Sequence, residues 1–259
     1  MKKYNMSQKL IQTIKQPYTK ASSAVLLQGV VGDWFHTSVG VRQGCLLSPT
    51  LFNIFLERIM TDALENHNGT VSIGGRNITN LRFADHIDRL PGNEDELANL
   101  VSCLDDTSRK YGMEISAGKT ELMTNSTTPF TRNIVDSGQQ LETVNQFKYL
   151  GAIISEEGSK AEVLARAAQT AAALAKLKPI WNDRNISLRS KLKLLHALVL
   201  SIFLYACESW TLTAELQKKI QAVEMRCTRR VLGISYTDHI TNEEVRRTVK
   251  QHMPTTKTY

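Results

Sequence analysis

The segment LRFADHIDRL, residues 81–90, carries the residues of this sequence that are best suited to metal chemistry. Apolar residues on both sides of a polar pair, Asp85 and His86, predict two short strands joined by a tight turn. A carboxylate at the tip of such a hairpin presents oxygen ligands to a hard cation such as Mg²⁺. Metal-dependent catalysis of that kind uses two or more convergent carboxylates, yet the neighbour of Asp85 is a histidine. A metal site, a metal site that has lost a ligand, and an ordinary turn are all compatible with these residues.

Other metal and nucleophile patterns are weak. The four cysteines are scattered and form no CxxC pair, and no two histidines lie three or four residues apart. The sequence therefore favours neither a zinc site nor a disulfide framework. Gly118-Lys119-Thr120 matches the end of a phosphate-binding P-loop, but Met113 stands where that motif requires its first glycine.

The composition is that of a globular protein. The 259 residues, 42% of them hydrophobic and 22% charged, suffice for one large domain or two modest ones. No apolar run approaches the ~20 residues that span a bilayer. The basic N-terminus is not followed by the apolar stretch of a signal peptide. We therefore expect an intracellular protein, in the nucleus or the cytoplasm, with no membrane partner.

The positive charge is concentrated in the C-terminal part of the chain. Residues 1–158 hold 15 lysines and arginines against 17 aspartates and glutamates, whereas residues 159–259 hold 17 against 8. A basic segment of this kind favours a polyanionic partner, most often a nucleic acid. A solvated basic surface without a partner is the alternative that charge alone leaves open.

The elements that would position these residues follow from periodicity and turn signals. Residues 1–158 predict an α+β unit with helices at about 7–16, 48–66 and 93–111 and short strands between and after them. Within it we expect hairpin strands at 24–27 and 34–39 around a turn at 29–33. Ser48 is the expected N-cap of the second helix, with Pro49 in its first turn, and Asn93 with Glu96 resembles a capping box.

Residues 159–259 predict only helices. Ser159 with Glu162 is the expected cap of an alanine-rich helix to about residue 178, and further helices are expected at 187–207 and 213–232. Thr241 with Glu244 starts a last helix. On the third of these helices the apolar stripe leaves five cations largely off the buried face, namely Lys218, Lys219, Arg226, Arg229 and Arg230.

Four segments occur in an order and spacing that identify a family. These are VGVRQGCLLSPTLFNIFLE, LRFADHIDRL, KYGMEISAGKTELM and FKYLGAIIS. Together they resemble successive palm motifs of reverse transcriptases (RNA-directed DNA polymerases) from non-LTR, LINE-type retrotransposons. The later segments YACESWTL and RCTRRVLGISYTDHITNEEVRR resemble the thumb of the same enzymes and the segment after it. The resemblance extends from about Leu10 to Arg247. It implies an incomplete right-hand polymerase palm, an antiparallel sheet with helices at residues 1–158, followed by an all-α basic thumb and a truncated C-terminal segment at 159–259.

The resemblance also implies roles for individual residues. Asp85 corresponds to a catalytic metal ligand, with His86 in place of the second aspartate, and Lys119 to a catalytic lysine that neutralises charge on the leaving pyrophosphate. The residues that resemble the template and nucleotide loop are Arg42, Gln43 and Gly44. Those that resemble the primer grip are Phe147, Tyr149, Leu150 and Gly151. The five cations at residues 218–230 are expected to bind nucleic acid.

The implied chemistry raises a difficulty for this chain. Family members use two Mg²⁺ (or Mn²⁺) ions, held by the aspartate pair at the hairpin tip and by an aspartate on an earlier strand. The first carboxylate of the chain is that of Asp33, so none occurs in residues 1–32. Of the aspartate pair at the hairpin tip, only Asp85 is present. The nitrogen of His86 suits zinc better than magnesium. We therefore expect the chain to begin after the strand that supplies the first metal ligand, to bind the metal poorly, and to be inactive as a polymerase.

Two alternatives to an inactive reverse transcriptase fragment are retained. The first is a non-catalytic module that binds RNA or an RNA/DNA duplex, with an RNA template and DNA primer as its partners. The second is a fragment that does not fold stably, in which Val25, Ile73 or Phe83 would be exposed. The sequence gives no indication of the oligomeric state.

Overall fold

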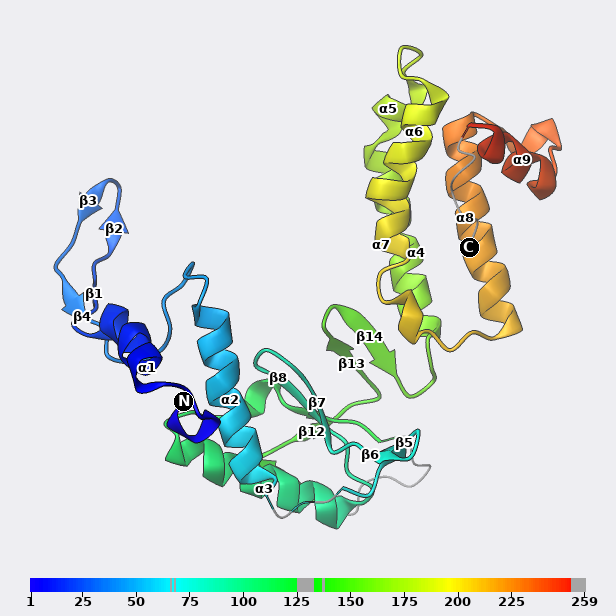
Figure 1. Cartoon of the computed structure of the whole chain (residues 1–259). Helices are drawn as coiled ribbons and strands as arrows, with labels where there is room; N and C mark the ends of the chain where they lie inside the picture. Colours follow the sequence, from blue (N-terminus) through cyan, green and yellow to red (C-terminus); the bar gives the residue numbers. More distant parts are fainter. Residues whose placement is uncertain (66, 68, 125–132, 137, 253–259) are drawn as a thin grey trace. The chain divides into compact units, whose positions relative to one another are not determined.

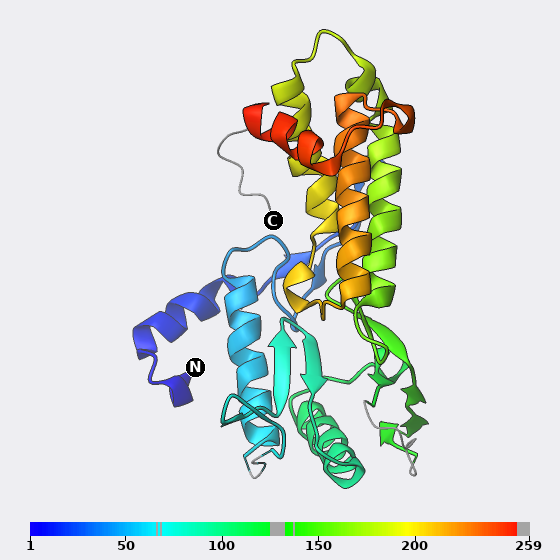
Figure 2. The same ribbon diagram turned by 90° about the vertical axis from the view of Figure 1, so that its right-hand side faces the viewer.

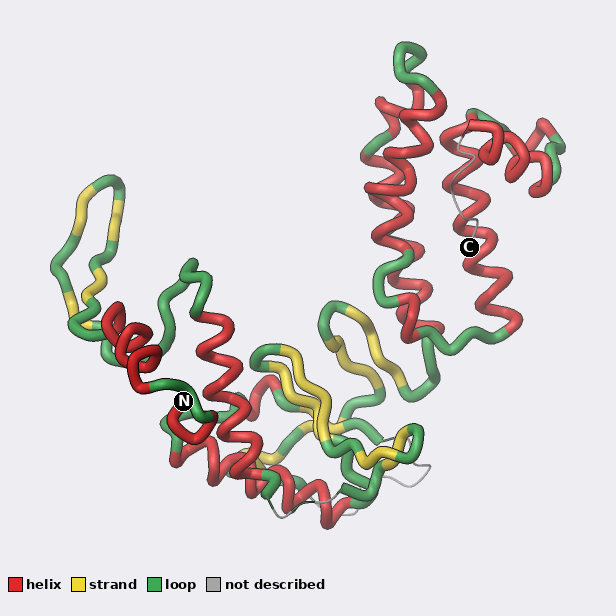
Figure 3. Tube along the Cα trace, viewed as in Figure 1, coloured by secondary structure: helices red, strands yellow, loops and turns green. Residues whose placement is uncertain are grey.

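The computed structural model describes residues 1–65, 67, 69–124, 133–136 and 138–252. The chain divides into two compact units (Figure 1). The first unit comprises Met1–Thr120 and Phe130–Leu141, and the second comprises Glu121–Pro129 and Glu142–Tyr259. Short strands and helices are both present (Figure 3), which confirms the predicted α+β class.

The first unit begins with helices and a long two-stranded ribbon. Its 3₁₀ turns are η1 (Lys2–Tyr4) and η2 (Gln16–Tyr18), and between them lies α1 (Gln8–Lys15). The ribbon consists of β1 (Ser22–Ser23) paired with β4 (Phe35–His36), and β2 (Leu26–Leu27) paired with β3 (Val30–Val31). All of these pairs are antiparallel. The predicted turn at residues 29–33 is wrong in position, because the chain reverses at Gln28 and Gly29, where both φ angles are positive.

The ribbon exposes apolar side chains. Val25, Leu27 and Val30 are 64%, 70% and 70% exposed, and Phe83 in a later hairpin is 61% exposed. A two-stranded ribbon is marginally stable by itself because it buries little apolar surface. The exposure expected of a fragment with low stability is therefore seen at Val25 and Phe83, whereas the side chain of Ile73 lies outside the described residues.

Helices α2 and α3 form the core of the first unit. Helix α2 spans Ser48–Ala63 and α3 spans Glu94–Lys110. Their buried contact is made by Leu56, Ile59 and Met60 of α2 with Leu104 of α3. Asn93 caps α3 as predicted, since its side chain accepts a hydrogen bond from the Glu96 backbone N–H at 2.8 Å. The core thus lies where the apolar periodicity of the two segments placed it.

The N-cap predicted for α2 is wrong. The N-cap position is occupied by Leu47, which makes no side-chain cap, and Ser48 is the first residue of the helix. The Ser48 hydroxyl instead donates a hydrogen bond of 2.5 Å to the carbonyl oxygen of Arg42. The Ser48 hydroxyl therefore bonds to a carbonyl of the preceding loop and not, as its predicted role requires, to the free N–H groups at the start of α2.

The remaining elements of the first unit are short hairpins and one turn. The hairpins are β5 (Ser72–Ile73) with β6 (Arg76–Asn77), β7 (Asn80–Phe83) with β8 (His86–Arg89), and β10 (Val135–Asp136) with β11 (Gln139–Gln140). The 3₁₀ turn η3 spans Ala117–Lys119. Each sheet has two strands, so helices rather than strands supply most of the buried surface.

The second unit consists of two small strand pairs and a helical bundle. Strand β9 (Glu121–Leu122) pairs in parallel with β12 (Glu142–Thr143), and β13 (Gln146–Tyr149) pairs antiparallel with β14 (Ala152–Ser155). The helical elements are α4 (Lys160–Lys176), α5 (Lys178–Asn182), α6 (Leu188–Leu194), the π-helical segment η4 (Leu195–Leu200), α7 (Ser201–Phe203), η5 (Cys207–Ser209), α8 (Ala214–Leu232), η6 (Tyr236–Asp238) and α9 (Asn242–His252). Helices α4 and α8 lie side by side (Figures 1 and 2).

The bundle core combines residues from α4 through α8. Leu174, Leu192, Val199 and Cys227 are among its buried members. The indole N–H of buried Trp181 donates a hydrogen bond of 2.9 Å to the Leu174 carbonyl, so the polar edge of the ring is satisfied inside the core. No described helix combines the length and the apolar composition that crossing a membrane requires.

Most helix ends of the second unit follow the sequence signals. Thr213 caps α8, and Gly233 ends it with φ at +70°, a conformation that glycine adopts without strain. Thr241 and Glu244 exchange the two hydrogen bonds of a capping box at α9. Ser159 is the N-cap residue of α4 as predicted, but it makes no side-chain cap, because its hydroxyl oxygen accepts a hydrogen bond from the Thr211 N–H at 2.8 Å.

Burial of Cys227 leads to a prediction about thiol reactivity. Removal from solvent raises the pKa of the Cys227 thiol to about 11. At pH 8 about one such thiol in a thousand is ionised, and the thiolate is the reactive form. We expect iodoacetamide to label exposed Cys103 well before Cys227 in the folded protein, as followed by mass spectrometry. Equal labelling rates for the two thiols under native conditions would contradict this description of the core.

Candidate functional site

The hairpin of β7 and β8 presents Asp85 and His86 to solvent. Phe83 pairs with His86, so Ala84 and Asp85 form a two-residue turn. Ala84 has a φ of +53°, which is uncommon for a residue with a side chain and marks a constrained turn. Ile87 of β8 packs against the core of α2 and α3. One side of the hairpin is thus fixed by the core, while its tip remains accessible.

A salt bridge also ties the hairpin to α2. Arg82 Nη1 of β7 lies 2.8 Å from Glu57 Oε2. Both side chains are partly exposed, so solvent screens the interaction and its contribution to stability is small. The salt bridge places the Glu57 carboxylate of α2 beside Arg82 in β7, the strand that precedes Asp85.

The donor set at the hairpin tip does not match a site for a hard divalent ion. Such ions take six or more oxygen ligands, usually from several carboxylates. Within the described residues, no group of three histidine, cysteine, aspartate or glutamate side chains could hold a metal ion. Asp88 pairs with Leu81 further along the ladder rather than at the turn. The described tip therefore offers one carboxylate, from Asp85, and one imidazole, from His86.

The loop that resembles a nucleotide-binding loop is ordered by its own backbone. Arg42 and Gln43 are exposed, and Gly44 has a φ of +78°, which an L side chain rarely adopts. The Arg42 carbonyl accepts hydrogen bonds from the Cys45 N–H at 3.3 Å and from the Ser48 hydroxyl. These bonds hold the loop against the start of α2 and leave the Arg42 side chain directed away from the buried part of the unit.

Cys45 is influenced by the same loop geometry. The pKa of its thiol is lowered, chiefly because the Leu47 backbone N–H donates a hydrogen bond to the sulfur. The hydroxyl of Ser48 and the charge of Arg42 act in the same direction, and partial burial opposes them. In the sequence Cys45 is one of four scattered cysteines, and its position there gives no signal of this environment.

Lys119 ends the 3₁₀ turn η3 with its side chain exposed. The turn is closed by a hydrogen bond of 2.9 Å from the Lys119 N–H to the Ser116 carbonyl. In the described part of the first unit, no hydrogen bond or ion pair joins Lys119, Arg42 and Asp85 to one another. The structure thus positions each residue locally and does not join them through direct contacts.

The base of the β7–β8 hairpin lies near a buried carboxyl group. Asp136 of β10 is 1% exposed, and neither of its carboxylate oxygens has a hydrogen-bond partner within the described residues. Burial, together with the nearby charge of Asp105, raises the pKa of Asp136, while Arg89 and Arg109 oppose the shift. Burial also disfavours the charged form of Arg89, and for a guanidinium this lowers the pKa. Burial thus disfavours the charged forms of both Asp136 and Arg89, the last residue of β8.

In the second unit, β13 and β14 form the hairpin that carries the expected primer grip. Leu150 and Gly151, with φ angles of +48° and +88°, form its two-residue turn, as in type I′ hairpins. Phe147 and Tyr149 lie on the same face of β13, with ring centroids 6.4 Å apart. All four residues are half-buried.

Side chains of α4 and of the turn between α7 and η5 hold the tip of this hairpin. Arg166 Nη2 of α4 donates a hydrogen bond of 2.5 Å to the Gly151 carbonyl, and the Tyr205 hydroxyl donates one of 2.6 Å to the Leu150 carbonyl. Glu162 of α4 accepts from the Ile153 N–H at 2.7 Å and from Arg166 Nε. Sequence reasoning missed Arg166 and Tyr205. The available signal was the Glu162–Arg166 pair, four residues apart in an otherwise alanine-rich helix.

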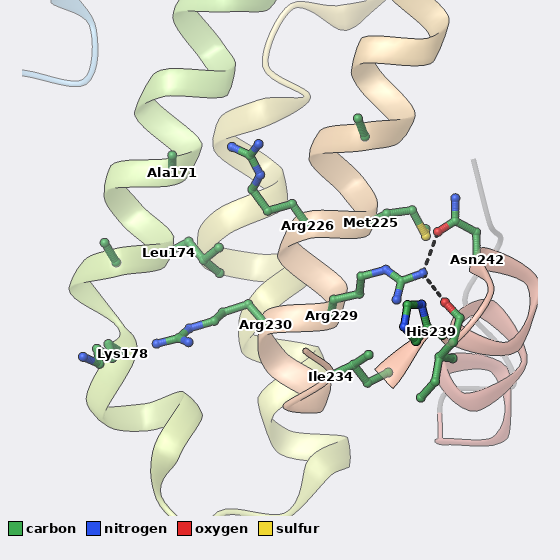
Figure 4. A pocket seen from close by; sticks show the side chains of 13 residues that line it. Ala171, Leu174, Lys178, Met225, Arg226, Arg229, Arg230, Ile234, His239 and Asn242 are labelled. Carbon is green, nitrogen blue, oxygen red and sulfur yellow. Dashed lines mark hydrogen bonds between the residues drawn. The ribbon is translucent and has the colours of Figure 1, made fainter. Parts of the chain in front are cut away.

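The five cations expected on α8 have different environments. Lys219 forms a salt bridge of 2.7 Å with Glu215. Arg229 donates hydrogen bonds to the Ile240 carbonyl and the Asn242 side chain, and therefore links α8 to the start of α9 (Figure 4). Lys218, Arg226 and Arg230 are exposed, and no ion pair is formed by them within the described residues.

Three of these cations, Arg226, Arg229 and Arg230, line a hollow beside α4 and α8. The hollow has a volume of about 960 Å³, and Arg226, Arg230 and Lys178 lie along it (Figure 4). Ala171, Ala175 and Ala222 are also part of its lining. Small side chains at these positions keep the surface open, so the exposed cations Lys178, Arg226 and Arg230 face one accessible region, whereas Arg229 is bound to the start of α9. Lys178 was not among the residues singled out from the sequence.

Comparison with known families covers the site residues of the β7–β8 hairpin, the Arg42 loop, Lys119 and the β13–β14 hairpin. A family model described as "Reverse transcriptase (RNA-dependent DNA polymerase)" matches residues 2–154, more than half of the chain. The chain belongs to this family. The matched range of this reverse transcriptase sequence includes Arg42-Gln43-Gly44, Asp85-His86, Lys119 and the β13–β14 turn.

Three relatives of this reverse transcriptase sequence are similar over much of it. An uncharacterized transposon-derived protein of Caenorhabditis elegans is 26% identical over 64% of this chain and 60% of that protein. The RNA-directed DNA polymerase from mobile element jockey of Drosophila funebris is 24% identical over 88% of this chain and 25% of that protein. The retrovirus-related Pol polyprotein from type-1 retrotransposable element R2 of Popillia japonica is 24% identical over 87% and 37%, respectively.

The chain therefore spans 25% to 60% of the lengths of these relatives. Two of them are named after mobile or retrotransposable elements, and both matches extend beyond the range of the family model. The resemblance to reverse transcriptases of non-LTR retrotransposons, which four ordered motifs indicated, is confirmed by these matches.

Proposed function

We propose that this chain is the reverse transcriptase domain of a non-LTR retrotransposon protein, with palm-type residues at 1–158 and thumb-type residues at 159–259. The family match over residues 2–154 is the observation that carries the proposal. In this assignment the partners are an RNA template and a DNA primer. Arg42, Gln43 and Gly44 form the template and nucleotide loop, since this exposed loop bends through a glycine with positive φ.

The proposed roles of the other residues follow the same assignment. Asp85 is the metal-binding and catalytic carboxylate, and Lys119 neutralises charge on the leaving pyrophosphate. The primer grip comprises Phe147, Tyr149, Leu150 and Gly151. Support comes from the exposed tip of the β7–β8 hairpin, the exposed Lys119 side chain, and the rigid turn between β13 and β14.

We further propose that the 259-residue chain does not polymerise DNA by itself. Bound Mg²⁺ or Mn²⁺ would supply charge stabilisation at the transferring phosphate. Asp85 is the residue that would contribute an oxygen ligand, whereas His86 contributes a nitrogen, which magnesium disfavours. One carboxylate at the tip does not provide the ligand set that two adjacent ions need.

Primer extension tests this proposal. The purified chain is expected to extend no oligo(dT) primer on a poly(rA) template with either Mg²⁺ or Mn²⁺. His86→Asp is also expected to remain inactive, because residues 1–32 of this chain supply no further carboxylate. Extension by the purified chain would refute the inactivity. Extension by His86→Asp alone would show that the tip needs only its second aspartate.

A second candidate function is nucleic-acid binding without catalysis. The observation that favours it is the group formed by Lys178, Arg226 and Arg230 along one open hollow. Three exposed cations that form no ion pair with any described residue are suited to phosphates, which dominate affinity for nucleic acids. Fluorescence anisotropy with a labelled RNA/DNA hybrid distinguishes this function from a domain that has lost both activities, because only the former binds.

A further inference from the structure

The turn of the β13–β14 hairpin is held on both of its carbonyl groups by side chains. The Leu150 carbonyl accepts a hydrogen bond from the Tyr205 hydroxyl, and the Gly151 carbonyl accepts one from Arg166. In a two-residue turn these carbonyls normally point to solvent, because the ladder ends before them. A side chain of α4 and one from the turn between α7 and η5 bond to these carbonyls in place of water.

The holding group is itself firmly fixed. Glu162 and Arg166 have side chains only 3% and 10% exposed, and Arg166 Nε donates to Glu162 Oε1 at 2.5 Å. The Arg166 guanidinium lies 4.5 Å from the centroid of the Tyr205 ring, within the range of a cation–π contact. Arg166 and Tyr205 therefore restrain each other as well as the turn.

A third bond extends the attachment along the hairpin. The second oxygen of the Glu162 carboxylate accepts a hydrogen bond of 2.7 Å from the Ile153 N–H of β14. Side chains of α4 therefore contact the turn at Gly151 and the strand at Ile153. The spacing of Glu162 and Arg166, one helical turn apart, matches this arrangement because both side chains project from the same face of α4.

We propose that Arg166 and Tyr205 are positioning residues for primer binding, which hold the Leu150–Gly151 turn at one place on helix α4. The proposal rests on the assignment of this hairpin as a primer grip. A free two-stranded hairpin flexes about its connections, and a flexible grip would spread a bound primer end over many positions. Anchoring the turn to α4 makes the hairpin and the helix one rigid surface.

The geometry of the turn supports this role over simple stabilisation. Leu150 adopts a positive φ of +48°, which costs free energy for a residue with a branched side chain. A Cβ atom added at Gly151 would lie 3.5 Å or more from the atoms of the Tyr205 side chain. The hydroxyl and the guanidinium thus hold the turn in a conformation that the chain would otherwise leave readily.

The test compares two RNA/DNA hybrids of equal length, one with a recessed DNA 3′ end and one blunt. A positioned primer grip is expected to bind the recessed end more tightly than the blunt duplex. Tyr205→Phe keeps the ring but removes the bond to Leu150, and Arg166→Lys keeps the charge but removes the guanidinium geometry. Each is expected to reduce the preference for the recessed end about fivefold, the loss typical of one hydrogen bond.

Matched measurements separate positioning from folding. Tyr111→Phe removes a comparable tyrosine hydroxyl, which donates to Asp62 in the first unit, and should leave the preference unchanged. The melting temperature of each variant is recorded in parallel. A double-mutant cycle of Tyr205→Phe with Tyr149→Ala is expected to be non-additive in the preference, because both changes act on the same hairpin.

Each outcome supports or overturns the proposal. If the unaltered chain binds neither hybrid, or binds both equally, the assignment of the primer grip fails and the positioning role fails with it. If the unaltered chain prefers the recessed end and both variants keep that preference, only the positioning role is refuted. Should Arg166→Lys fail to fold, Tyr205→Phe decides, since it leaves the buried pair of Glu162 and Arg166 intact.

Discussion

Replacement of Arg166 by alanine is expected to destabilise the second unit by about 3–5 kcal/mol. The change leaves the Glu162 carboxylate buried without its cation, and the desolvation cost of that charge is no longer offset. It also removes the hydrogen bond to the Gly151 carbonyl and the cation–π contact with Tyr205. The effect should appear as a lower urea midpoint, followed through the fluorescence of Trp181 and Trp210, both in the second unit, in a Trp34→Phe background.

The chain contains a matched control for this measurement. Glu215 and Lys219 form a salt bridge at the same i,i+4 spacing on α8, but their side chains are 68% and 38% exposed. Lys219→Ala is expected to change the free energy of unfolding by less than about 0.5 kcal/mol, since solvent screens exposed pairs. Similar losses for Lys219→Ala and Arg166→Ala would contradict the role assigned to burial.

The helices of this protein were largely predictable because their signals are local. Apolar periodicity located α8, with Thr213 and Gly233 at its ends, and the Thr241–Glu244 capping box located the start of α9. In each case the residues that end the helix interact with its own backbone. Sequence spacing therefore contained the information that the structure uses.

The failures share a physical cause. Ser48 and Ser159 have the right type and position for caps, yet each hydroxyl bonds to a backbone group that is distant or belongs to a loop. Arg166 of the alanine-rich helix was likewise not singled out from the sequence. Its burial depends on a carbonyl 15 residues earlier in the chain, at Gly151. Competition from tertiary partners cannot be read from local spacing.

The candidate site was predictable to a different extent. Motif order identified the family. The β7–β8 turn was predicted at Asp85-His86 but lies one residue earlier, at Ala84–Asp85, and the turn between β13 and β14 was not predicted. The sequence did not reveal that Arg229 is bound to the start of α9, nor that Lys178 joins Arg226 and Arg230 along the hollow. Charge counts cannot distinguish cations that stabilise the fold from cations that remain available for a ligand.

The cations that remain available for a ligand are the basis of the second prediction with a large expected effect. Binding of an RNA/DNA hybrid is expected to weaken about 100-fold between 50 and 200 mM salt. The estimate takes four phosphate contacts, from Lys178, Lys218, Arg226 and Arg230, each of which adds about −0.9 to the slope of log affinity against log salt concentration. The counterions released from the phosphates drive this dependence. Anisotropy titrations at several salt concentrations measure the slope directly.

Single substitutions show which residues contribute to the slope of log affinity against log salt concentration. Arg226→Ala and Arg230→Ala are each expected to reduce it by about 1, because each removes one phosphate contact. Arg246 lies in the same unit with Glu224 as its partner, at 3.8 Å, so Arg246→Ala should leave the slope unchanged. A flat salt response of the unaltered chain would mean that phosphates do not dominate binding. Equal slopes for all three variants would show that the hollow beside α4 and α8 is not where the nucleic acid binds, since Arg226 and Arg230 would then behave like a cation outside it.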